Sequence, residues 1–136
     1  MYDQLIKDKK FSQALRHVAK IEGVTPQILK NGIQKGECVI TLNNNKKILK
    51  PCAIGKGLKT KINVNIGTSP DKIDLSTELK KLELSIELGA DAIMDLSIGG
   101  NLKKIRRAII KRSPIPVGTV PIYEAAINAH SRKGSF

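Results

Sequence analysis

The sequence predicts an α/β fold, in which about three βα units (residues 62–136) follow a small, mostly helical N-terminal segment (residues 1–61). Three observations predict it. After residue 61, short strand-like runs alternate with helical periodicity, the order typical of parallel strands joined by helices. The hydrophobic share of 40% suffices for a packed core, and 136 residues fit one domain rather than two. Positive charge concentrates in residues 1–61, which hold 13 basic and 4 acidic residues, whereas residues 62–136 hold 11 basic and 8 acidic residues.

The N-terminal segment is expected to hold two helices and a short strand. The first helix covers residues from about 3 to 22 and ends at Gly23. Thr25 is a typical N-cap before the proline that opens the second helix, which ends at Gly36. A strand follows over residues 37–42. The residues expected to face inward in the two helices are Phe11, Leu15, Val18, Ile28, Leu29 and Ile33.

Polar and breaking residues fill the interval between that strand and the βα units. Residues 43–47 predict a polar turn, since they read Asn-Asn-Asn-Lys-Lys. Residues 48–60 contain Pro51 and two glycines and predict a loop.

The first βα unit begins with alternating polar and apolar residues over 61–66, which predict a strand ending at Gly67. Asp71 or Asp74 can cap the following helix, and Gly89 ends it. The inward face of that helix is predicted to hold Leu75, Leu79, Leu82 and Ile86.

Two further units follow the same order. A strand over 91–96 precedes a helix capped by Asn101, which the prolines of residues 113–116 end. A short strand over 117–120 precedes a helix from Tyr123 to about residue 131. Such units occur both in open doubly wound sheets and in eight-fold barrels. Neither a dinucleotide-binding nor a P-loop glycine motif follows the first strand.

The net charge of +12 raises the question of nucleic-acid binding. Most of the cations are lysines spread along the chain, whereas recognition of phosphate and guanine favours arginine. Four aromatic residues are too few for a stacking platform. A basic surface without a nucleic-acid partner is therefore expected, and a nucleic-acid-binding or scaffold module stays the alternative.

The sequence also indicates a cytoplasmic protein without metal ligands of its own. No apolar run approaches the length of a membrane helix, and the polar start of the chain is unlike a signal peptide. Cys38 and Cys52 are not spaced as a metal motif, and the two histidines, His17 and His130, do not complete one.

Candidate ligand contacts follow the carboxyl ends of the predicted strands, where parallel α/β folds bind their ligands. Asn65, Met94 and Tyr123 are separated by equal steps of 29 residues, which places them on one rim. Each residue also has a structural alternative. Asn65 could belong to a hydrogen-bond network of asparagines, Met94 could pack in the core, and the Tyr123 hydroxyl could lie in water. Asp95 could bind a ligand or hold the next loop, and the glycine loops could bind phosphate or only turn the chain.

Three segments at this rim carry a specific resemblance. Residues 54–67 (IGKGLKTKINVNIG), 89–97 (GADAIMDLS) and 113–123 (SPIPVGTVPIY) are similar to the phosphomethylpyrimidine synthase family, which belongs to the radical S-adenosylmethionine enzymes. The resemblance reaches back to residues 24–26 and covers most of the chain.

The resemblance implies a (β/α)8 TIM-type barrel, of which this chain would hold the first three units, after a small N-terminal domain. It implies a carbon–carbon lyase of thiamine biosynthesis that converts 5-aminoimidazole ribotide, with S-adenosylmethionine, into hydroxymethylpyrimidine phosphate. It also implies a [4Fe–4S] cluster and zinc in the full-length enzyme. By resemblance, Asn65 would hydrogen-bond the ribotide, Met94 would pack on it and Tyr123 would close that side.

The family's cluster cysteines, zinc histidines and later substrate residues have no counterpart in these 136 residues. A family segment of the form I-P-A-N-x-N-H is altered here over residues 40–46, and Ile98 stands where a small or polar residue is common. We therefore expect a portion that is inactive alone and that depends on the missing C-terminal portion or on self-association. A further alternative is a scaffold piece that docks on a complete synthase.

Overall fold

The computed structural model describes residues 9–42 and 50–133, and the chain separates into two compact units, Met1–Lys61 and Ile62–Phe136. The first residues of the predicted N-terminal helix and the predicted turn at 43–47 lie outside the described residues. None of the described helices is long and apolar enough to cross a membrane.

The first unit packs two helices against a two-stranded antiparallel sheet. Its elements are α2 (Lys9–Glu22), α3 (Pro26–Gln34), β1 (Cys38–Ile40) and β2 (Ala53–Gly55). The Thr25 side chain accepts a hydrogen bond from the Ile28 N–H at 3.3 Å, so the predicted N-cap of α3 is confirmed. The buried core of this unit consists of Val18, Ala19, Leu29, Cys38 and Ala53.

Two expectations for this unit are wrong. Residues 53–55 form strand β2 rather than part of a loop, because Gly55 lets the chain lie directly against β1. A Cβ on Gly55 would meet the Glu37 carbonyl oxygen at 2.3 Å, so this glycine permits close pairing instead of interrupting a strand. The helical spacing predicts that Ile28 faces inward, yet its side chain is 57% exposed, and Leu29 is the buried residue of α3.

A buried ion pair fixes the last residues of the first unit. Glu22, at the end of α2, accepts a hydrogen bond from the Lys59 N–H at 2.9 Å and pairs with the Lys61 ammonium at 2.9 Å. Because both of its oxygens have partners, this carboxylate can be buried without an unpaired charge. Residues 59–61 are thereby held against α2.

The second unit alternates strands and helices. Its elements are β3 (Asn63–Ile66), α4 (Leu75–Glu87), β4 (Ala92–Asp95), α5 (Leu102–Arg112), β5 (Val117–Thr119) and α6 (Pro121–Lys133). The strands are parallel and lie in sequential order, β3-β4-β5. The α/β class is confirmed, and the described strands form an open sheet, not a closed barrel.

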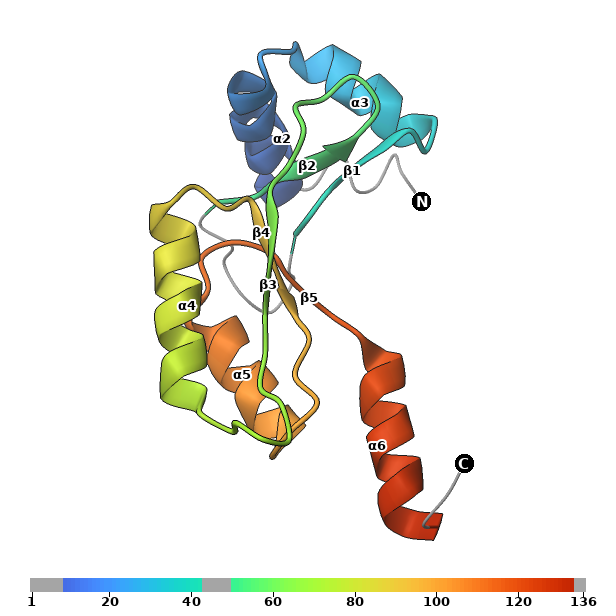
Figure 1. The fold of residues 1–136 in the computed structure, drawn as a ribbon. Helices are drawn as coiled ribbons and strands as arrows, with labels where there is room; N and C mark the ends of the chain where they lie inside the picture. The colour runs from blue at the N-terminus through green and yellow to red at the C-terminus, as the bar shows by residue number, and fades with distance from the viewer. Residues whose placement is uncertain (1–8, 43–49, 134–136) are drawn as a thin grey trace. The chain divides into compact units, whose positions relative to one another are not determined.

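Both α4 and α5 cover the same face of this sheet (Figure 1). The buried residues of the second core are Ile66, Leu82, Ile93, Ile105, Ile109 and Ile115, drawn from the sheet, from both helices and from the turn before β5. Asp74, rather than Asp71, caps α4 by accepting from the Ser76 and Thr77 N–H groups. Asn101 caps α5 as predicted, by accepting from the Lys104 N–H.

Candidate functional site

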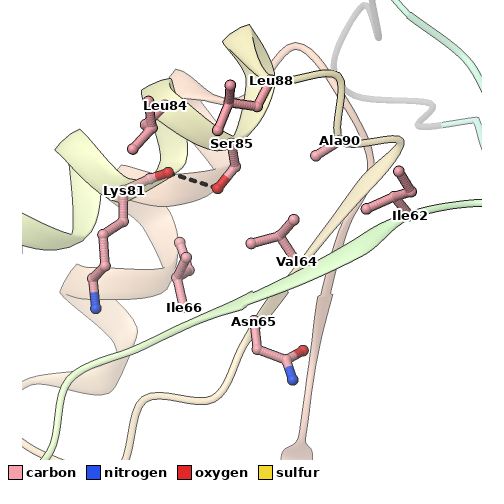
Figure 2. A pocket seen from close by; sticks show the side chains of 9 residues that line it. All are labelled: Ile62, Val64, Asn65, Ile66, Lys81, Leu84, Ser85, Leu88 and Ala90. Carbon is pink, nitrogen blue, oxygen red and sulfur yellow. Dashed lines mark hydrogen bonds between the residues drawn. The ribbon is translucent and has the colours of Figure 1, made fainter.

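Strand β3 separates an apolar side from a polar side. Val64 and Ile66 point toward α4, whereas the amide of Asn65 points to the opposite side of the strand (Figure 2). Successive residues of a strand alternate between the two faces of its sheet, so Asn63 shares the face of Asn65. Both asparagines are exposed. The sheet face away from α4 and α5 therefore carries the first predicted ligand contact.

The parallel register places the second predicted contact beside the first. Asn65 pairs with Met94, and Met94 pairs in turn with Gly118 of β5. Directly paired residues project to the same face of a sheet, on strands about 4.8 Å apart. Met94 is half-buried. The structure thus brings Asn65 and Met94 together in one row across the sheet.

Tyr123 lies in a different element. It belongs to the first turn of α6, where its N–H donates to the Val120 carbonyl at 3.1 Å, and it is 42% exposed. The helix begins at Pro121, two residues earlier than predicted, because proline suits the first position of a helix. Tyr123 therefore follows the carboxyl end of β5 but is not part of the Asn65–Met94 row.

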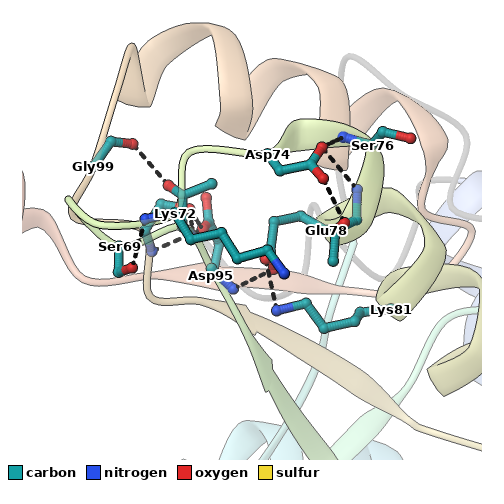
Figure 3. Close-up of polar contacts among 12 residues, drawn as sticks. Ser69, Lys72, Asp74, Ser76, Glu78, Lys81, Asp95 and Gly99 are labelled. Carbon is teal, nitrogen blue, oxygen red and sulfur yellow. Dashed lines mark hydrogen bonds and ion pairs between the residues drawn. The ribbon is translucent and has the colours of Figure 1, made fainter.

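The loops after β3 and β4 are tied to each other. The Thr68 N–H donates to the Ser97 hydroxyl at 3.1 Å, the Thr68 hydroxyl donates to the Gly99 carbonyl at 2.7 Å, and the Ile98 N–H donates to the Thr68 carbonyl at 2.9 Å. Figure 3 shows polar contacts around Ser69, Asp95 and Gly99 together with the start of α4, which Asp74 caps. A Cβ on Gly67 would meet the Ser97 nitrogen at 2.6 Å, so the two loops touch through this glycine.

Acceptors of the chain itself occupy N–H groups of the loop after β3 and of the start of α4. Gly67 donates to the Glu78 carboxylate at 2.7 Å, and Ser69 donates to the Lys72 carbonyl at 3.2 Å. Asp74 fills the N-terminus of α4, and the hydrogen bonds from Thr77 hold the pKa of Asp74 below its usual value. The N–H groups of Gly67 and Ser69 in the first of these loops are therefore engaged within the chain rather than open to a phosphate.

Asp95 has a structural role. It is buried, and one oxygen accepts both the Ser97 N–H at 3.0 Å and the Ser97 hydroxyl at 2.5 Å. Asp95 pairs with Ile66 in the register and therefore projects toward the helices, away from Asn65 and Met94. Of the two roles open to it from sequence, holding the next loop is the one the structure supports.

Two residues that matter to this site were not singled out in the sequence. Glu78 is a buried carboxylate that receives the Gly67 N–H and pairs with the Lys81 ammonium at 2.6 Å. Helical periodicity gave no signal for it, because it lies next to the apolar positions of α4. Gly118 lies under Met94, and a glycine within a predicted strand is a signal of such close approach.

An apolar groove of about 260 Å³ runs along the outer edge of β3, between the strand and α4 (Figure 2). Residues of β3, of α4 and of the segments next to them line it: Ile62, Val64, Asn65, Ile66, Lys81, Leu84, Ser85, Leu88 and Ala90. Leu88 is 76% exposed and Leu84 is 54% exposed. The groove lies on the helix side of the sheet, opposite the Asn65 side chain.

The described residues offer no cluster of three or more His, Cys, Asp or Glu side chains that could hold a metal ion. The chain has two cysteines, Cys38 and Cys52, and both are buried in the first unit as reduced thiols. Burial raises the pKa of the Cys38 thiol, which donates to the Leu29 carbonyl at 3.6 Å. A [4Fe–4S] cluster is typically held by four thiolates, so these residues do not fit one.

Comparison with known proteins decides the family. The family model described as "Radical SAM ThiC family" matches residues 4–136. The chain belongs to the radical SAM ThiC family. Curated relatives named phosphomethylpyrimidine synthase include that of Methanococcus maripaludis strain S2, 54% identical over 123 residues (90% of this chain, 29% of the relative), and that of Thermodesulfovibrio yellowstonii, 50% identical over 133 residues (98% and 31%).

A third relative of the same name, from Thermoanaerobacter sp. strain X514, is 48% identical over 125 residues, or 92% of this chain and 29% of the relative. The chain thus spans about 30% of the length of these ThiC-family relatives. The resemblance found in the three rim segments is confirmed, and the family match includes the row of Asn65, Met94 and Gly118.

Proposed function

We propose that this chain is a portion of a phosphomethylpyrimidine synthase of thiamine biosynthesis, a cytoplasmic radical S-adenosylmethionine lyase. In the whole enzyme, 5-aminoimidazole ribotide and S-adenosylmethionine would yield hydroxymethylpyrimidine phosphate. The chain would contribute one side of the ribotide site through Asn65, Met94 and Tyr123. The [4Fe–4S] cluster and zinc would be held by residues outside this chain.

The row of Asn65 and Met94 is the observation that supports the site most directly. An amide that can both donate and accept lies beside a polarizable thioether, on the sheet face that α4 and α5 do not cover. Such a pair suits a ligand with a planar heterocycle and polar substituents, as the ribotide has. Tyr123 would reach this face from the first turn of α6.

The proposed fold of the whole enzyme is a (β/α)8 barrel, of which the second unit would form the first three βα repeats. Two features support it. The parallel strands lie in sequential order, and α4 and α5 lie on one face, as the outer layer of such a barrel requires. The row of Asn65 and Met94 would then face the barrel interior at the carboxyl ends of the strands.

Replacing Asn65 by aspartate tests the site. Asn65→Asp keeps the shape of the side chain but removes the donor and places a negative charge near a phosphate-bearing ligand. We expect the affinity for the ribotide to fall more than about tenfold, as loss of a hydrogen bond to a charged ligand implies. Titration calorimetry would measure it on the chain assembled with the remaining part of a curated relative.

Asn128→Asp is the matched control, since Asn128 is an exposed asparagine of α6 and the change in charge is the same. It should leave the affinity for the ribotide unchanged. Equal binding by the Asn65→Asp variant and the unmodified chain would contradict the proposed site.

A further inference from the structure

Gly118 occupies the third position of the Asn65–Met94 row. It is the middle residue of β5 and pairs directly with Met94 of β4. A Cβ built on Gly118 would lie 3.0 Å from the Met94 methyl carbon and 3.1 Å from its sulfur. The thioether of Met94 therefore lies across the bare backbone of β5.

Backbone conformation does not require glycine at this position. The glycines with positive φ in the described residues are Gly23, Gly36, Gly55, Gly57, Gly67, Gly89 and Gly100. Gly118 is not among them, so its backbone conformation is open to other residues. Glycine also weakens a strand, because it has no side chain to pack. The reason for glycine must lie in the space above it, which Met94 fills.

The atoms that a Cβ would meet first belong to the flexible end of a side chain. The nearest backbone atom in its way, the Ile93 carbonyl oxygen, is 3.9 Å away, an ordinary contact distance. A methyl group at position 118 would therefore displace the Met94 thioether and leave the strand backbone in place. Methionine adapts easily to such changes, since its side chain is unbranched.

We propose that Gly118 is a positioning residue for the ligand site: its missing side chain lets the Met94 thioether lie flat across β5 and form an apolar platform. The platform fits a planar heteroaromatic ring, such as the imidazole of the ribotide, because sulfur packs favourably against aromatic rings. Gly118 acts through Met94 and does not itself contact the ligand. The ligand identity rests on the proposed function above, whereas the placement of Met94 does not.

The test for the placement of Met94 needs no ligand. The chain has two methionines, Met1 and Met94, so labelling with [13C-methyl]-methionine gives two resolvable methyl signals. Gly118→Ala should shift the Met94 methyl signal, and Gly118→Val should shift it further. The control is Thr119→Val, since Thr119 pairs with Asp95 and projects to the opposite face. An unmoved Met94 signal in Gly118→Ala would overturn the positioning role.

Ribotide binding, measured on the chain assembled with the remaining part of a relative, tests the consequence. Gly118→Ala should weaken binding about tenfold in the presence of Met94 but have no further effect on a Met94→Ala background, because the two changes act through one side chain. An additive effect would overturn the role of Gly118. A loss of stability caused by Gly118→Ala would persist on the Met94→Ala background, so the cycle separates it from an effect through the Met94 side chain.

The outcomes separate the two proposals. A Met94 signal that shifts in Gly118→Ala, together with an unmodified assembly that binds no ribotide, would confirm the placement and contradict the proposed function. Ribotide binding that is equal in the unmodified and Gly118→Ala assemblies would contradict the platform and leave the family's site assignment intact.

Discussion

Three carboxylates of the second unit accept hydrogen bonds from N–H or hydroxyl groups of the chain itself. Asp74 accepts from the start of α4, Glu78 accepts the Gly67 N–H and pairs with Lys81, and Asp95 accepts from Ser97. A carboxylate that accepts hydrogen bonds in this way orders the loop or helix end that donates them. Asp74, Glu78 and Asp95 therefore have structural roles in the second unit.

Asp74 makes the start of α4 sensitive to acid. Hydrogen bonds from the Thr77 hydroxyl and N–H lower its pKa in the folded state. A lowered folded-state pKa contributes stability above the unfolded-state pKa of about 3.9, and this stability is lost as pH falls through the lower folded value. We expect the chain to lose more stability between pH 6 and pH 3 than Asp74→Asn does, since asparagine caps without titrating.

Urea unfolding followed by circular dichroism at the two pH values measures this difference. Because other carboxylates titrate in both proteins, only the difference between them reports on Asp74. Identical losses of stability in the two proteins would show that Asp74 does not contribute.

At the scale of single elements, the sequence predicts helices better than strands. Thr25 and Asn101 are found as caps because capping is local chemistry between residues three apart. Strand β2 is missed because it exists through its pairing with β1, which a window over Pro51 and Gly55 cannot show. Ile28 and Leu29 are adjacent, and only the position of the packed strands decides which of them is buried.

Helix α4 offers a direct comparison of a buried and an exposed leucine. Leu82 is fully buried in the second core, whereas Leu84 is 54% exposed at the groove. We expect Leu82→Ala to lower the free energy of unfolding by about 2–5 kcal/mol, through lost burial and the cavity left behind. Leu84→Ala should change it by about 0.5 kcal/mol or less.

Both variants keep the helix propensity of the position high, so the comparison isolates packing. Chemical denaturation of the two single variants beside the unmodified chain is the measurement. Equal losses of stability would mean that α4 does not pack on the sheet through Leu82.

At the scale of the whole molecule, the candidate site is only partly visible in the sequence. The spacing of Asn65 and Met94 places them in neighbouring strands, and the register puts them side by side. The same spacing cannot place Tyr123, because α6 lies beyond the end of the sheet and its orientation depends on packing. The sequence does not identify Gly118 as a site residue, because its proposed role is to leave space for the Met94 side chain.

We propose that the apolar groove beside β3 is the surface that would receive the further chain present in the longer relatives. On its outer edge, β3 has no strand partner among the described residues, and the groove beside it exposes Leu84 and Leu88. Relatives about three times as long supply the chain that could add a strand and a helix there. We expect Leu84→Lys/Leu88→Lys to abolish co-purification with the remaining part of a relative.

Glu87→Lys is the matched control, because Glu87 lies on α4 outside the groove residues and its replacement changes the net charge by the same amount. It should co-purify normally. Unimpaired assembly of the double variant would contradict the docking surface. A double variant that still assembles but no longer forms a homodimer, as measured by sedimentation, would contradict it too.

We expect the isolated chain to form no product when it is mixed with iron, sulfide, reductant and both substrates.

The bonds between the loops extend the pairing of β3 and β4 well past the last residues of the strands. Leu96 donates to Ile66, Thr68 donates to Ser97, and Ile98 donates to Thr68. In deuterated water, these loop amides should exchange at the slow rate of the sheet rather than at the rapid rate of a surface loop. The rim would then open only together with the strands below it, so that a ligand meets a surface already ordered before it arrives.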